Sequence, residues 1–197
     1  MIPQLSPIIR DRWSPRAFDP DRPVELEKIR SVLTAAQWAP SSSNLQPWSF
    51  ILGVNFDASH QKILSTLKEG NSVWASNAPV LILTVAEIYR NGVSNRFAFH
   101  DVGLATQNLL TEATNLGLIG HFMGGFWPNV ASQIFHIPEG FEAVAVGAIG
   151  YRGREDLLSE DLRQREQRVR VRKNLDTFVF GEDWGIPIML PPVNLVE

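Results

Sequence analysis

The sequence predicts one globular domain in which helices alternate with buried strands, and three observations support this prediction. The chain has 197 residues, enough to enclose one sizeable core. Residues 80–86 form a continuous, largely apolar run, VLILTVA, which is typical of a strand covered on both faces. Residues 101–116 carry apolar side chains at helical spacing, which predicts a long helix.

The composition excludes several classes of protein. Hydrophobic residues make up 44% of the chain and charged residues 20%, as in an ordinary globular protein. The net charge of -3 gives no overall attraction to nucleic acid or to anionic lipid. Without cysteine the chain has no disulfide and no thiolate chemistry. Neither a signal-peptide core nor an apolar run of the roughly 20 residues that span a membrane is present, so we expect a soluble, cytoplasmic protein.

The first third of the chain predicts three helices and a strand. Ser6 suits an N-cap and Pro7 the first position of a short helix. Residues 24–38 predict a second helix, with an inner face of Leu26, Ile29, Leu33 and Ala36. After a strand at 50–54, Asp57 can cap a third helix over 58–68, which Gly70 would end. Its inward side chains would be Ile63, Leu64 and Leu67.

The later elements surround the long helix. Residues 72–79 lead into the strand at 80–86, and Gly117 suits the C-terminal cap of the helix at 101–116. The inner face of that helix would be Val102, Ala105, Leu109 and Ala113. The remaining predicted elements are a strand at 119–123, a short helix at 128–135 and a last strand at 143–149.

A stiff polar loop, APSSSNLQPWSF, occupies residues 39–50. Pro40 and Pro47 fix φ near both ends and prevent the loop from becoming helical. Such a loop suits a flat ligand rich in heteroatoms, because little ordering entropy is lost on binding. An ordinary capped turn has a similar composition and stays open as an alternative.

Two groups of arginines lie near opposite ends of the chain. Residues 10–16 contain three arginines around a serine, and three more alternate with valines within the charged segment 154–173. Guanidinium forks match phosphate oxygens better than lysine does. A solvated helix end and a solvated linker are the simpler alternatives. Nucleic-acid binding is disfavoured, because acidic residues directly precede Arg168 and no aromatic residues are interleaved.

Familiar catalytic and metal-binding patterns are missing from the sequence. The four histidines lack metal-ligand spacing, and no dinucleotide fingerprint, Walker sequence or nucleophile elbow occurs. Catalysis by this chain would therefore need a cofactor.

Four elements, in order, resemble the FMN-dependent nitroreductase family, which includes NAD(P)H nitroreductases and flavin reductase-like proteins. They are RxSxRxF at residues 12–18, the loop at 39–50, the word HDVGLATQNLLTEATNLGL at 100–118 and FMGGF at 122–126. Two later words, RKNL at 172–175 and FGEDWG at 180–185, also resemble family elements.

The resemblance implies an α+β fold, a mostly antiparallel sheet flanked by helices, in an intertwined homodimer with two FMN sites at its interface. Residues 1–197 would form a single FMN-binding domain. The charged segment and C-terminal arm at 153–197 would embrace the partner subunit, with the apolar tail from Ile186 lying across it.

The resemblance also assigns the cofactor site. FMN phosphate and ribityl would be held by one subunit through Arg10, Arg12, Ser14, Arg16, Arg170 and Arg172. The other subunit would contribute Pro40, Ser41, Ser42, Asn44 and Gln46. Gly124 and Gly125 would line the isoalloxazine with amides near N5, and Lys68 and Asn71 are further candidates for donors near N1.

The implied activity is an NAD(P)H-dependent FMN oxidoreductase with a ping-pong mechanism. Hydride would pass from NAD(P)H to flavin N5 and then to an electron-poor small molecule, such as a nitroaromatic or a quinone. No catalytic side chain is expected, because the flavin carries the chemistry. Dehalogenation, ene reduction, substrate oxidation and flavin breakdown are alternatives on the same fold. A non-enzymatic dimer that binds anions or nucleic acid is another. Residues 87–99 leave room for only a short substrate lid.

Overall fold

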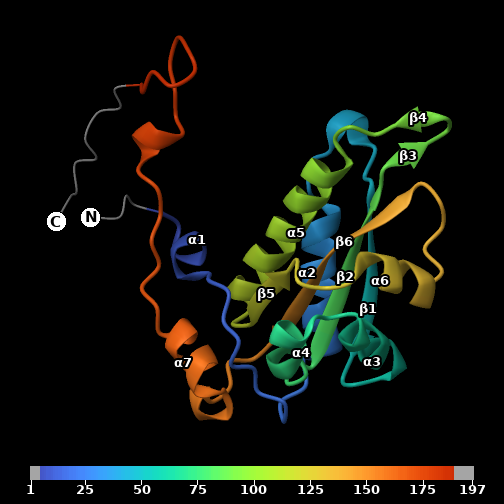
Figure 1. The fold of residues 1–197 in the computed structure, drawn as a ribbon, viewed down its shortest axis with the longest axis vertical. Helices are drawn as coiled ribbons and strands as arrows, with labels where there is room; N and C mark the ends of the chain where they lie inside the picture. The colour runs from blue at the N-terminus through green and yellow to red at the C-terminus, as the bar shows by residue number, and fades with distance from the viewer. Residues whose placement is uncertain (1–4, 189–197) are drawn as a thin grey trace.

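Four antiparallel strands form the central sheet, in the order β1-β2-β6-β5, in the computed structural model, which describes residues 5–188 (Figure 1). Their bounds are β1 Trp48–Val54, β2 Val80–Glu87, β5 Ile119–Met123 and β6 Phe141–Gly150. The strands predicted at 50–54, 80–86, 119–123 and 143–149 are therefore confirmed.

The apolar run of β2 is explained by helices on both faces of the sheet. Leu81 and Leu83 belong to the core cluster beneath α3, α4 and α6, whereas Val80 and Ile82 belong to the cluster beneath α2 and α5 (Figure 1). Every residue from Val80 to Ala86 is buried. Successive side chains of a strand point to opposite faces, so a strand buried on both sides shows no alternation.

Helix α5, Ala98–Asn115, is the long helix that the sequence predicts, begun three residues earlier. All four inner-face residues that were predicted are buried. Its end is a Schellman motif, in which Gly117 N donates to Thr114 O and Leu118 N donates to Ala113 O. Gly117 has φ +74°, which explains why a glycine occupies the position.

Helix α2, Leu26–Gln37, confirms the predicted helix but corrects its inner face. Leu26 is 68% exposed, and the buried residues of the helix are Ile29, Val32 and Ala36. Val24, directly before the helix, is buried and takes the place in the core that was predicted for Leu26.

The helix predicted over 58–68 is wrong at its end. Asp57 caps α3 as predicted, because its side chain accepts from His60 N at 2.7 Å, but α3 is only Ala58–Ser65. Leu67 then bridges to Phe126, and a new helix, α4 Glu69–Ala75, contains Gly70 rather than ending at it. Pairing with the chain beyond β5 breaks the helix at this point.

The other elements are short. They are α1 Pro7–Asp11, α6 Pro128–Ile134, α7 Glu160–Glu166, the 3-10 turns η1 Ser42–Asn44, η2 Glu155–Leu157 and η3 Leu175–Thr177, and a hairpin of β3 Tyr89–Arg90 with β4 Val93–Ser94. Helices α1 and α6 were predicted, whereas α7 lies in the charged segment 154–173, for which no helix was predicted.

The structure describes the predicted C-terminal arm as far as residue 188, and below the name is kept for residues 168–188. This arm runs away from the sheet (Figure 1). The predicted apolar tail lies outside the described residues from position 189 onward. No helix within residues 5–188 is long and apolar enough to cross a membrane.

Candidate functional site

The N-terminal arginine segment, residues 10–16, is attached to the end of β6. Phe18 and Arg152 form an antiparallel bridge, flanked by hydrogen bonds from Gly153 N to Ala17 O at 2.8 Å and from Asp19 N to Tyr151 O at 3.0 Å. This attachment places residues 12–16 beside β5 and α7.

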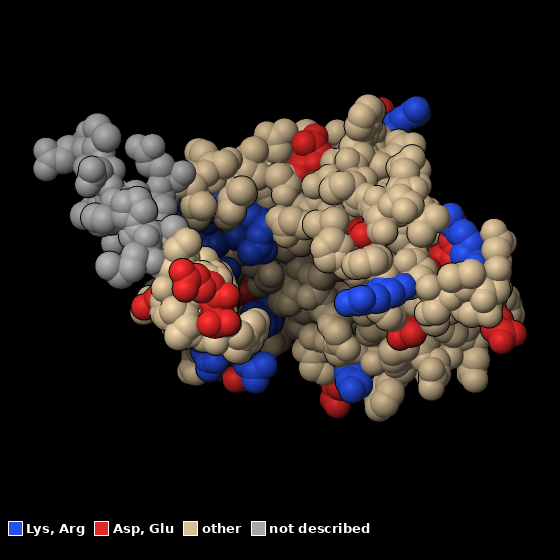
Figure 2. Space-filling view, turned by 90° about the horizontal axis from the view of Figure 1, so that it is seen from above, with Lys and Arg blue, Asp and Glu red and all other residues tan. Residues whose placement is uncertain are grey.

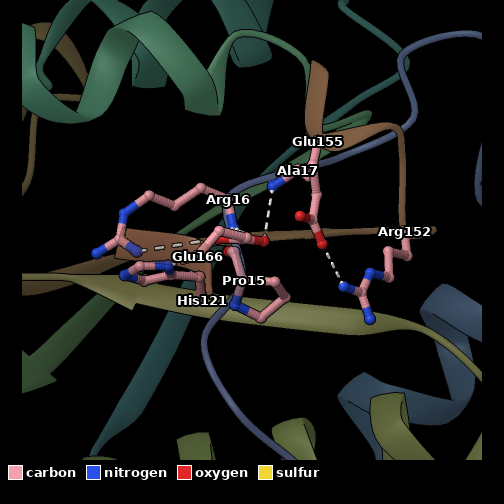
Figure 3. Close-up of polar contacts among 7 residues, drawn as sticks. All are labelled: Pro15, Arg16, Ala17, His121, Arg152, Glu155 and Glu166. Atoms are coloured by element: carbon pink, nitrogen blue, oxygen red, sulfur yellow. Dashed lines mark hydrogen bonds and ion pairs between the residues drawn. The ribbon is translucent and has the colours of Figure 1, made fainter. Parts of the chain in front are cut away.

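An aromatic stack of Phe18, Trp74 and His121 packs against the arginine segment. The ring centroids of His121 and Trp74 are 4.6 Å apart, and those of Trp74 and Phe18, which are stacked, are 6.1 Å apart. His121 Nδ1 donates to Pro15 O at 3.1 Å, since a carbonyl oxygen can only accept (Figure 3). Strand β5 is thereby joined to the arginine segment through one imidazole.

Glu166, at the last position of α7, holds the segment from the other side (Figure 3). Its two carboxylate oxygens accept from Arg16 N at 2.9 and 3.0 Å, and one of them accepts from Ala17 N at 3.3 Å. The Arg16 guanidinium lies 3.9 Å away. Sequence reasoning missed Glu166, because one acid inside a highly charged segment gives no signal of burial.

The two arginine groups meet where the C-terminal arm begins. Arg170 Nη1 donates to Arg12 O at 2.6 Å, and Arg170 Nη2 donates to Arg10 O. Burial lowers the pKa of Arg12, and the charges of Arg170 and Arg172 lower it further. No carboxylate of residues 5–188 lies within ion-pair distance of these last three arginines.

The other predicted phosphate ligands differ in their surroundings. Arg10 is paired with Asp11 at 2.7 Å, and Arg16 faces Glu166. Ser14 is exposed beside them. Lys and Arg side chains gather in a recess beside the C-terminal arm (Figure 2). A hollow of about 440 Å³ in this region is lined by Asp11, Trp13, Arg152, Glu155, Glu166, Gln167, Arg168 and Arg170.

The glycine pair, Gly124 and Gly125, directly follows β5. Gly125 O accepts from Lys68 N and from Asn71 Nδ2, both at 3.0 Å. A Cβ built on Gly124 would meet nothing within 4 Å. Neither glycine amide donates a hydrogen bond to another described residue. Both amides are therefore free to meet a ligand, and Lys68 and Asn71 lie beside Gly125.

The polar loop has a fixed and unusual backbone. Ser43, Asn44 and Gln46 have φ of 50°, 54° and 48°, a region that residues other than glycine seldom occupy. Gln46 N donates to Ser41 Oγ at 3.0 Å, and Gln46 Nε2 donates to Asn44 Oδ1 at 3.1 Å. Ser42 N donates to Asp101 Oδ2 at 3.0 Å, and Pro40 is exposed. These hydrogen bonds link the loop to itself and to α5.

Within one chain, this loop is separated from the arginines. It lies at the N-terminal end of α5, whereas residues 10–16 lie near α7, at the other end of the sheet (Figure 1). Within one chain the arginine segment contacts both the arm and β5.

The residues present fit an anionic, flat cofactor. Arginines without a carboxylate partner suit a phosphate, and the open space at Gly124, with the free amides of Gly124 and Gly125, suits the edge of a planar ring. The described residues contain no group of three or more His, Cys, Asp or Glu that could hold a metal ion.

We expect the stability of the folded protein to fall in acid because of His121. Burial lowers its pKa from 6.5 to about 4, with the Arg16 charge adding to the effect. Below pH 6.5 the unfolded chain binds a proton that the folded chain excludes. Stability is therefore full above pH 6.5 and declines down to about pH 4. Because the ring is only partly buried, we expect a loss of about 1–2 kcal/mol between pH 7 and 5.

Urea unfolding at several pH values measures this dependence. His121→Gln should flatten the slope between pH 4 and 6.5, and an unchanged slope in that variant would assign the acid sensitivity to another group.

Comparisons with known proteins point to one family. A sequence profile of the nitroreductase family matches residues 9–65 and 53–151. A Mycolicibacterium smegmatis protein, named only as an uncharacterized 15.4 kDa protein in the ask 5' region, is 34% identical over 132 residues. That alignment covers 67% of this chain and 88% of the relative. An Archaeoglobus fulgidus protein, provisionally named NADH dehydrogenase/NAD(P)H nitroreductase, is 28% identical over 174 residues, covering 84% of this chain and 96% of the relative.

A crystal structure described as an oxidoreductase containing FMN has a TM-score of 0.85 and 34% identity, covering 91% of this chain and 92% of that one. The chain therefore belongs to the nitroreductase family, and the predicted α+β, nitroreductase-like fold is confirmed.

Proposed function

We propose that this protein is an FMN-dependent oxidoreductase whose arginine cluster binds the FMN phosphate. The observation that carries the proposal is the contact of Arg170 with Arg12, where neither these two arginines nor Arg172 has a carboxylate partner among residues 5–188. Like charges held near one another favour binding of an anion, and guanidinium–phosphate bonds are charge-assisted.

The active form is proposed to be a homodimer. The loop at 39–50 would reach the partner's arginines, since within its own chain it lies far from them (Figure 1). The C-terminal arm carries exposed apolar side chains in the single chain, among them Val169, Val171 and Trp184 at 87%, 80% and 91% exposure. Burying such side chains against a partner would stabilise the dimer.

The proposed reaction is hydride transfer from NAD(P)H to an electron-poor acceptor by a ping-pong mechanism. Bound FMN would supply the redox chemistry by accepting and releasing hydride at N5. The free amides of Gly124 and Gly125 would hold the edge of the flavin ring. Lys68 N and Asn71 Nδ2 both donate to the carbonyl oxygen of Gly125 and so fix the backbone there. The only lid element among residues 87–99 is the short hairpin, which carries the exposed ring of Tyr89 and is followed by the exposed rings of Phe97 and Phe99. A planar nitroaromatic or quinone suits this open, aromatic setting.

An absorbance spectrum of the purified protein tests the proposal, with the released chromophore identified by mass. We expect flavin bands, FMN released near one per subunit, and consumption of NADH or NADPH when a quinone or a nitroaromatic is added. A colourless protein that ignores added FMN would overturn the proposal and favour a non-enzymatic anion-binding dimer. A flavoprotein that reduces neither acceptor would favour another reaction on the same fold.

Arg12→Ala is expected to weaken FMN binding about 10- to 150-fold. The substitution removes a charge-assisted phosphate contact, which contributes about 1.5–3 kcal/mol. Titration of apoprotein with FMN, followed by flavin fluorescence, measures the change. Arg154→Ala is a suitable control, because Arg154 is an exposed arginine already paired with Asp156. Equal affinities in the two variants would remove Arg12 from the site.

A further inference from the structure

Two carboxylates are buried among residues 5–188, Asp101 at 1% exposure and Glu166 at 4%. A buried charge is costly unless hydrogen bonds compensate it. Each of these carboxylates accepts backbone N–H groups, and in both cases the donor belongs to a segment predicted to bind the cofactor.

Glu166 binds the backbone of the arginine segment rather than its side chain. The Arg16 and Ala17 amides lie 2.9–3.3 Å from its oxygens, whereas the Arg16 guanidinium is 3.9 Å away, beyond hydrogen-bond distance. The guanidinium donors of Arg16 are thus not consumed by this carboxylate. Glu166 also stands two residues before Arg168, where the arm begins, so it fixes both arginine groups relative to each other.

Asp101 plays the same part for the polar loop. Its Oδ2 accepts from Ser42 N at 3.0 Å, and its Oδ1 lies 3.1 Å from His100 Nδ1. Asp101 stands in the first turn of α5, a long helix packed on the sheet. The loop that it holds contains three residues with positive φ. Such a conformation persists only where the surroundings determine it.

We propose that Glu166 and Asp101 are positioning residues, each of which holds the backbone of one half of the FMN site. The proposal rests on the proposed function. Glu166 acts on the half that would bind phosphate, and Asp101 acts on the half that would reach the ribityl chain and ring of the partner's flavin.

The test compares FMN with riboflavin, which lacks the phosphate, using apoprotein and flavin fluorescence. Glu166→Gln keeps the side-chain size but turns an amide N–H₂ toward backbone donors. We expect it to weaken FMN binding about tenfold or more, while riboflavin binding stays within about twofold of wild type. Glu160→Gln, the same change at an exposed position of α7, should alter neither affinity.

Asp101→Asn removes the same charge at the other half of the site and should give a different pattern. The affinities for FMN and for riboflavin should fall by equal factors, about tenfold, because the loop is not expected to touch the phosphate. A general loss of structure would lower the affinity for both ligands in both variants. Equal loss in Glu166→Gln, or a phosphate-selective loss in Asp101→Asn, would overturn the proposal.

Amide hydrogen exchange gives a readout without cofactor. Protection of the Arg16 and Ala17 amides should fall about tenfold in Glu166→Gln, and that of the Ser42 amide should fall similarly in Asp101→Asn. Unchanged protection would overturn the positioning role. A wild-type protein that binds no FMN would overturn the proposed function, and with it this inference. A wild type that binds FMN beside a Glu166→Gln variant of equal affinity would overturn the inference alone.

Discussion

Replacing Trp74 by alanine is expected to lower the free energy of unfolding by about 4 kcal/mol. The Trp74 side chain is 1% exposed and lies between the rings of Phe18 and His121. Its removal would leave a large cavity between α4, β5 and the N-terminal segment. Because Phe18 and His121 both hold the arginine segment, FMN affinity should fall as well.

Trp74→Phe separates the loss of aromatic packing from the effect of the unpaired indole N–H. Trp74 Nε1 is buried and has no hydrogen-bond partner among the described residues. Phenylalanine keeps an aromatic ring and removes that unsatisfied donor, which itself costs about 1–3 kcal/mol. We therefore expect Trp74→Phe to lose less than half as much stability as Trp74→Ala. Urea unfolding followed by circular dichroism measures both, and a loss below about 1 kcal/mol in the alanine variant would contradict the packing described.

Gly153→Ala is expected to cost about 2–3 kcal/mol of stability and to weaken FMN binding. A Cβ at this position would lie 2.3 Å from Phe18 O and 2.4 Å from Phe18 C. These are backbone atoms, so the N-terminal segment itself would have to move. That movement would break the hydrogen bond from Gly153 N to Ala17 O and shift the arginines.

Gly70→Ala provides the matched control, because a Cβ there would meet nothing within 4 Å. It should be neutral or slightly stabilising in helix α4. Thermal unfolding and FMN titration of the two variants measure the difference. Equal melting temperatures would show that the bridge between Phe18 and Arg152 does not fix the segment.

The parts of the fold that the sequence predicted correctly depend on local signals. Residues 80–86 were identified from an apolar run, α5 from helical periodicity, Gly117 from its position after the helix and Asp57 from its position before one. Each of these signals lies within a few residues of the element that it specifies. The helix end at Ser65 was missed because pairing between Leu67 and Phe126 determines it, and those residues are far apart in the sequence.

The candidate site divides in the same way. The sequence by itself determined its chemical groups, namely the arginines around Ser14, the stiff loop at 39–50 and the glycine pair, because residue types and spacing are local properties. Only the tertiary structure decided which groups meet. It joined Glu166 to Arg16 across 150 residues and Asp101 to Ser42 across 59, and it separated the loop from the arginines of its own chain. Contacts of this kind arise from packing around the sheet, and no local pattern in the sequence encodes them.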